Sequence, residues 1–240
     1  MKIMRKLLNY FSKFEICLWT ISVLTITVTF IIFNKTNYLS LVSSLIGVTA
    51  LIFNAKGNPI GPFIMIIFSI IYSIISYSFA YYGELITYTC MSLPMSIYTF
   101  ICWIRNPFKG KKSQVKISNK LSKIEIIVMI ILTTIIMFAF YFILEALNTA
   151  NLIPSTISVA TSFLAVYLSA RRSPYFAFAY GINDIVLIVL WILATISDIT
   201  YISVVICFFI FLFNDGYTFV SWKKMKKIQE LTDLEDNYGN

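Results

Sequence analysis

The stretch Tyr98-Thr-Phe-Ile-Cys-Trp103 occurs a second time, slightly altered, as Tyr217-Thr-Phe-Val-Ser-Trp222. Each copy closes a long apolar run and is followed by basic residues. Upstream, Asn54-Ala-Lys-Gly-Asn-Pro59 resembles Ser169-Ala-Arg-Arg-Ser-Pro174 in the same way, and the spacing from proline to tryptophan is nearly equal in the two copies. The chain therefore contains an internal duplication.

The composition is that of a membrane protein. The 240 residues are 59% apolar and only 12% charged, whereas a soluble domain carries about 25% charged residues. A helix needs about 20 apolar residues to cross the hydrocarbon core. Runs of this kind lie near residues 16–33, 38–54, 60–80, 84–103, 124–144, 153–170, 175–195 and 199–222. The predicted fold class is therefore an all-α integral membrane protein with eight transmembrane helices.

The basic residues predict how the chain is oriented. Lys and Arg accumulate in the cytoplasmic loops of membrane proteins. With the N-terminus inside, the cytoplasmic segments collect nearly all of them, and only Lys35 falls outside. We therefore expect a multi-pass protein of the cell membrane with both termini in the cytoplasm. The net charge of +8 does not indicate nucleic-acid binding, because the basic residues flank apolar runs.

Each repeat holds three predicted helices. Because three is an odd number, a second copy joined directly to the first would start on the opposite side of the membrane and be inverted. The span near 124–144 restores its direction, so the repeats are predicted to be parallel. Transporters built from parallel repeats place the substrate at the repeat interface near mid-membrane. The predicted segments are an N-terminus with an extra helix (1–37), a first repeat (38–103), a basic loop with a linker helix (104–150), a second repeat (151–222) and a cytoplasmic tail (223–240).

Several chemistries are disfavoured by the residues present. The chain has no histidine, and its four cysteines all lie in apolar runs without a Cys-x-x-Cys motif, so we predict no metal site, no cofactor, no disulfide framework and no catalytic residue. Two alternatives to a transporter remain: a membrane enzyme acting on a lipid or isoprenoid, and a non-transporting scaffold or sensor. The acidic end after Lys227 is expected to be solvated and frayed.

The seventh span carries a carboxylate at its centre. An unpaired Asp184 there would cost about 2.5 to 3.5 kcal/mol, so it should face a cavity or a partner. Tyr180 and Trp191 share its helical face. This stripe suits a ligand with a flat ring and hydroxyl groups, because the ring can stack while the carboxylate accepts hydrogen bonds. The alternative is a carboxylate bound by a neighbouring helix.

Other polar residues in the spans are candidates for the same site. The eighth span carries Asn214 and Asp215. The fourth span carries a continuous polar stripe consisting of Tyr88, Ser92, Ser96, Thr99 and Trp103. Small hydroxyl residues also serve close helix packing, which is the alternative for each serine.

Several motifs resemble one known family. These are Tyr82-Gly-Glu-Leu, Leu93-Pro-Met-Ser, Arg171-Arg-Ser-Pro-Tyr, Asn183-Asp184 and Asn214-Asp-Gly-Tyr217. Over roughly residues 38–225 the chain is similar to the PnuC family of vitamin transporters. The resemblance implies a three-plus-one-plus-three architecture similar to the SWEET proteins, a homotrimer, and facilitated diffusion of nicotinamide riboside followed by trapping through a cytoplasmic kinase.

The candidate binding region departs from the family pattern. Ser96 stands where the family usually has glutamine, Tyr88 where it has asparagine, and Ala177 and Tyr180 where it has two tryptophans. Another nucleoside, thiamine or riboflavin is therefore also a candidate substrate. The predicted substrate-binding residues are Tyr88, Ser96, Thr99, Tyr180, Asn183, Asp184, Trp191, Asn214 and Asp215, and the predicted gate residues are Trp103 and Trp222.

Overall fold

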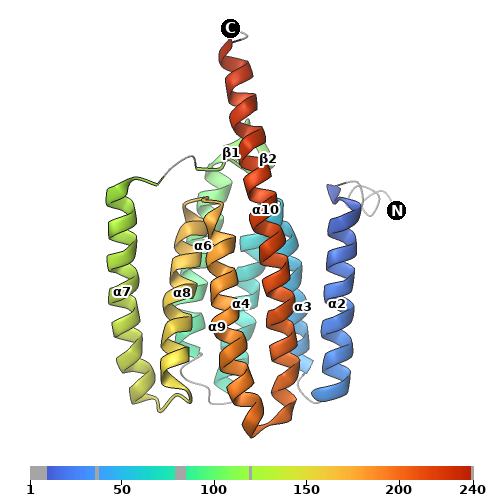
Figure 1. Cartoon of the computed structure of the whole chain (residues 1–240), viewed down its shortest axis with the longest axis vertical. Helices are drawn as coiled ribbons and strands as arrows, with labels where there is room; N and C mark the ends of the chain where they lie inside the picture. The colour runs from blue at the N-terminus through green and yellow to red at the C-terminus, as the bar shows by residue number, and fades with distance from the viewer. Residues whose placement is uncertain (1–9, 36–37, 79–84, 119–120, 239–240) are drawn as a thin grey trace.

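A computed structural model describes residues 10–35, 38–78, 85–118 and 121–238 as long, nearly aligned helices with one small hairpin (Figure 1). The elements are α2 (Lys13–Phe33), α3 (Tyr38–Ala55), α4 (Ile60–Ser78), the π-turn η1 (Thr87–Ser92), α6 (Leu93–Arg105), β1 (Pro107–Phe108), β2 (Lys111–Val115), α7 (Lys123–Ala146), α8 (Leu152–Ala170), α9 (Tyr175–Ser197), the 3₁₀ turn η2 (Ile199–Tyr201) and α10 (Ile202–Tyr238). The motif that begins at Tyr82 lies outside the described residues.

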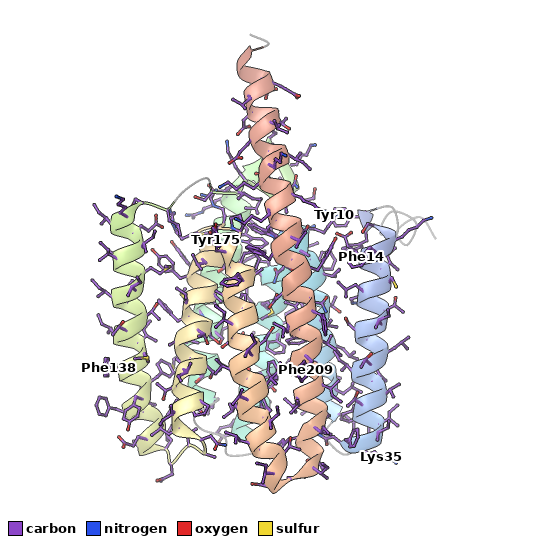
Figure 2. All side chains as sticks on the ribbon, in the orientation of Figure 1. Tyr10, Phe14, Lys35, Phe138, Tyr175 and Phe209 are labelled. Carbon is purple, nitrogen blue, oxygen red and sulfur yellow. The ribbon has the colours of Figure 1, made fainter. Side chains whose placement is uncertain are left out.

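The all-α membrane class is confirmed. Six of the described helices are long and apolar enough to cross a membrane, and Ile60–Ile74 of α4 is a shorter apolar stretch. Apolar side chains project outward all around the bundle (Figure 2). Because the surrounding lipid tails are as apolar as these side chains, the exposed isoleucines and phenylalanines carry no aqueous penalty.

The helices pack in two related sets. The helix α3 packs on α4 and on α10, while α8 packs on α9 and on α6. The helix α2 lies at one edge against α3 and α10, and α7 lies at the opposite edge against α8 (Figure 1). The helix α2 begins and α10 ends at the same end of the bundle (Figure 1).

The two related turns of the sequence have the same backbone geometry. Gly57 and Arg172, at equivalent positions, both have positive φ angles of 63° and 56°. The N–H of Gly57 donates to the Asn54 carbonyl at 2.9 Å, and that of Arg172 donates to the Ser169 carbonyl at 2.9 Å. Such left-handed residues end helices by satisfying their last carbonyl groups. The duplication therefore extends to the hydrogen bonds of the turns.

The expectation of a frayed tail is wrong. The helix α10 continues to Tyr238 and extends well beyond the bundle (Figure 1). Its acidic residues pair with the hairpin region, since Asp236 lies 2.5 Å from Lys109 and Asp233 lies 3.2 Å from Lys116. Gln229 accepts from the Ile117 N–H and donates to the Val115 carbonyl, both at 2.9 Å. The tail is a helix because a short β-hairpin supplies these partners.

Candidate functional site

A pair of carboxyl groups lies buried between α9 and α10. Asp184 is 4% exposed and Asp215 is 3% exposed, and the two carboxyl groups lie close enough to interact. One oxygen of each, Asp184 Oδ2 and Asp215 Oδ1, has no partner among the described residues. Neither group forms an ion pair there. The pair can therefore still accept a hydrogen bond or a positive charge.

Aromatic side chains of α9 lie on either side of this pair along the helix. Tyr180 lies one helical turn before Asp184 on α9, and its ring packs edge-on against Phe176 with centroids 6.2 Å apart. Trp191 lies toward the η2 end, where its ring is 5.3 Å from that of Tyr201. Tyr180 is therefore the aromatic residue of the predicted stripe that lies beside the carboxyl pair.

The two candidate asparagines make contacts between helices. The Asn214 amide donates to Ser22 Oγ of α2 at 3.1 Å and to the Ile210 carbonyl at 2.9 Å. Asn183 Oδ1 accepts from Thr161 and Ser162 of α8 at 2.8 and 3.0 Å. Asn214 is thus directed toward α2 and Asn183 toward α8. The partner Ser22 was not singled out by sequence reasoning, because nothing in the chain indicates which face of α10 meets the extra helix.

The candidates of the first repeat lie on η1 and α6. Ser96 and Thr99 are buried, and Thr99 Oγ1 has no hydrogen-bond partner among the described residues. Tyr88 belongs to the π-turn, and its ring lies 4.5 Å from that of Tyr72 on α4. Single π-turns within helices are frequent at functional sites. The Tyr72–Tyr88 contact was not predicted, because only the fold shows which residue of α4 faces the turn.

The two repeats differ at the level of the carboxyl pair. When the copies are aligned on Pro59 with Pro174 and on Trp103 with Trp222, Asp184 corresponds to Ser69 and Asp215 to Ser96. Both serines are buried. The second repeat therefore provides acidic groups where the first provides hydroxyl groups, so the interior is chemically asymmetric.

The predicted gate residues lie together at the end of the bundle where α2 begins and α10 ends. Trp103 and Trp222 are fully buried, with ring centroids 5.2 Å apart. Phe176 packs against both rings, at 6.2 and 4.7 Å. Next to them, the Val115 N–H donates to the Gly57 carbonyl at 2.9 Å and the Ser118 N–H to the Arg172 carbonyl at 3.0 Å. The end of β2 and the residues just after it thereby connect the two related turns.

Comparison with known proteins identifies the family and the fold. Residues 37–224 match the family model described as "Nicotinamide mononucleotide transporter". The chain is 22% identical over 226 residues to the nicotinamide riboside transporter PnuC of Neisseria mucosa, covering 93% of this chain and 86% of that protein. It shares its fold with the crystal structure of the vitamin B3 transporter PnuC, at a TM-score of 0.76 and 21% identity over 91% of this chain and 94% of the other. The predicted resemblance is confirmed, and the chain belongs to the nicotinamide mononucleotide transporter family.

Proposed function

We propose that this protein is a transporter that takes up nicotinamide riboside, or a related ring-bearing vitamin or nucleoside, through a site between two parallel three-helix repeats. The observation that carries the substrate class is the buried Asp184–Asp215 pair, which has unpartnered oxygens and no ion-pair partner among the described residues. The nicotinamide ring of the riboside is a pyridinium cation, so it would supply the missing positive charge. Tyr180, beside the pair, would contact the flat ring.

The amide of Asn214 would take a defined part in binding. Both of its N–H groups already donate, to Ser22 and to the Ile210 carbonyl, so it would offer its oxygen to a hydroxyl of the ribose. We assign Asp184 and Asp215 to the charged ring. Ser96, Thr99, Tyr88, Asn183 and Trp191 remain proposed wall residues of the same site.

The reciprocal packing of the helices supports the repeat architecture. The first helix of each proposed repeat, α3 or α8, packs on the third segment of the other, α10 or α6. This is the relation expected of two parallel units around an axis along the membrane normal. The helix α2 would be the extra helix and α7 the linker, and Trp103 with Trp222 would gate the cytoplasmic end.

The orientation and assembly are parts of the same proposal. We place both termini in the cytoplasm because nearly all basic residues then fall in the cytoplasmic segments, and because α2 begins and α10 ends at the same end of the bundle (Figure 1). The helix α7 buries only Met129 and Leu144, so its outer face is free to contact membrane lipids or the neighbouring copies of a homotrimer. Uptake would be facilitated diffusion, with a cytoplasmic kinase trapping the cargo by phosphorylation.

The test is competitive uptake of labelled nicotinamide riboside, thiamine and riboflavin in cells that lack their own carriers. We expect nicotinamide riboside to accumulate, and Asp184→Asn to lower this uptake at least tenfold at equal membrane expression. Asp198→Asn is the matched control. Asp198 is fully exposed at the η2 end, and the Thr200 N–H lowers the pKa of this carboxyl group. If none of the three compounds accumulates, transport of this substrate class is excluded, and unchanged uptake by Asp184→Asn would refute the site.

Membership of a transporter family also decides between the alternatives. A membrane enzyme acting on a lipid or isoprenoid is disfavoured because the matched family consists of transporters. A non-transporting scaffold would tolerate Asp184→Asn and show no ligand-dependent thermal shift, so the uptake panel separates it from the proposal.

A further inference from the structure

A cavity lies at the end of the bundle where α2 begins, along α10 from the carboxyl pair. Its volume is about 350 Å³, which is in the size range of small-molecule sites. It lies between the start of α2, the turn after α3, the hairpin and the extension of α10. Hydrogen-bonding side chains on its wall are Ser12, Lys56, Gln114 and Lys224, and Phe108 and Ile228 provide apolar wall.

The acidic group of this cavity is already neutralised. Glu15 Oε1 accepts from the Tyr217 hydroxyl at 2.8 Å, and Glu15 Oε2 accepts from the Ser12 N–H at 2.6 Å and lies 3.3 Å from Lys56 Nζ. The whole carboxylate is buried behind these contacts. A ligand in the cavity therefore meets a satisfied carboxylate rather than a free negative charge.

The remaining charge in the cavity is positive. Lys224 forms no ion pair within the described part of the chain, and its ammonium group is exposed beside the cavity. One N–H of the Lys56 ammonium group can point to Glu15, which leaves its other two N–H groups as donors. Ammonium and amide donors around a space of this size match the oxygens of a phosphate group.

We propose that this cavity binds a phosphate-bearing ligand at the cytoplasmic surface, either a soluble phosphate ester or the head group of an anionic phospholipid. Basic pockets at the cytoplasmic ends of membrane helices take phospholipid head groups by this chemistry. The cytoplasmic placement rests on the proposed function. The cavity is separate from the proposed gate but connected to it through the residues before Lys56. The Asn54 carbonyl accepts a hydrogen bond from Trp222 at 2.7 Å, and the Ala55 carbonyl accepts one from Ser221 at 2.8 Å.

The test measures binding to the full-length protein in nanodiscs of phosphatidylcholine, by calorimetry and thermal shift. The soluble probes are inorganic phosphate and glycerol 3-phosphate, which lack the nicotinamide ring and the ribose of the proposed cargo. In a parallel arm, phosphatidylglycerol replaces part of the neutral lipid. Lys224→Gln is the variant, and Lys227→Gln is the matched control, because Lys227 is equally exposed on α10 but does not line the cavity.

We expect Lys224→Gln to weaken binding by about tenfold, since it removes a charge-assisted contact, while Lys227→Gln stays within about twofold of the parent. If Lys224→Gln weakens binding of the soluble probes alone, the ligand is a soluble phosphate ester. If it reduces only the thermal shift caused by phosphatidylglycerol, the ligand is a lipid head group. The proposal is overturned if no probe binds, or if both variants change equally. Binding is measured without transport, so this result is independent of whether nicotinamide riboside is the cargo.

Discussion

Trp103 and Trp222 each donate a hydrogen bond to a turn of the opposite repeat. The Trp103 Nε1–H donates to the Ser169 carbonyl at 2.8 Å, and the Trp222 Nε1–H donates to the Asn54 carbonyl at 2.7 Å. Asn54 and Ser169 occupy equivalent places in the duplicated motif. The turn N–H groups of Gly57 and Arg172 already donate to these two carbonyls, so each indole adds a second donor that comes from the other copy of the duplicated sequence. Separating the repeats at this end requires breaking both bonds.

Replacing either indole by phenyl should destabilise the protein. Trp103→Phe and Trp222→Phe keep an aromatic ring but remove one of the two donors to a buried carbonyl, which costs about 0.5 to 1.5 kcal/mol. Thermal unfolding in detergent measures the loss. Trp19→Phe is the control, because Trp19 is 38% exposed and donates only to Thr49 at 3.2 Å. An equal effect of all three variants would show that the reciprocal bonds have no special role.

Removing Lys56 should be more harmful than removing Glu15. Glu15 Oε2 lies 3.3 Å from Lys56 Nζ, and the side-chain exposures are 3% for Glu15 and 27% for Lys56. Lys56→Gln leaves a buried carboxylate without its cation, at a cost on the order of 3 kcal/mol. Glu15→Gln leaves an ammonium group that water can reach, so its cost should be smaller. The free energies of unfolding of both variants and of the double variant test this order, and the reverse order would contradict the buried placement of Glu15.

Gln229 should control the order of the hairpin. Its side chain bonds the backbone at Val115 and Ile117, both at 2.9 Å. Gln229→Ala removes both partners, and the hairpin should open more often, by about 1 to 3 kcal/mol in local stability. Limited proteolysis within 107–118 measures this, with Glu235→Ala as a control on the same helix. Unchanged cleavage would indicate that the salt bridges of Asp233 and Asp236 suffice.

The sequence could predict the features that depend on local pattern. The apolar runs became helices because their length and composition allow no other spanning structure. The related turns at Gly57 and Arg172 were detectable as a repeated motif because their hydrogen bonds lie within a few residues. Trp103 and Trp222 were found by the same comparison, although the carbonyls to which they donate were not.

Features that depend on helix packing could not be predicted. Asp184 and Asp215 were each noticed as intramembrane carboxylates, but their contact depends on which faces of α9 and α10 meet. Asn214 binds Ser22 far away in the chain, a pairing without a local signal. The acidic tail looked solvated by composition alone, because its partners Lys109 and Lys116 lie on a hairpin region that has no alternating apolar pattern.

Two helical glycines should respond oppositely to alanine. A Cβ atom on Gly61 would overlap Asn54 Oδ1 and lie 2.8 Å from the Asn54 backbone nitrogen, whereas a Cβ on Gly216 would meet nothing within 4 Å. Gly61→Ala should therefore cost about 1 to 3 kcal/mol by overpacking. Gly216→Ala should be neutral or stabilising by up to about 1 kcal/mol, because alanine is the better helix former. Thermal unfolding of the two variants measures the difference.

The stability that Gly61→Ala costs should also depend on whether Trp222 is present. The backbone of Asn54 that must move away from the new methyl group carries the carbonyl that binds Trp222 at 2.7 Å. Once Trp222→Phe has removed this bond, the displacement of Asn54 has less to disrupt, so the double variant should lose less stability than the sum of the single variants. Strict additivity would show that Asn54 adjusts its side chain alone and that α4 packing and the gate are independent.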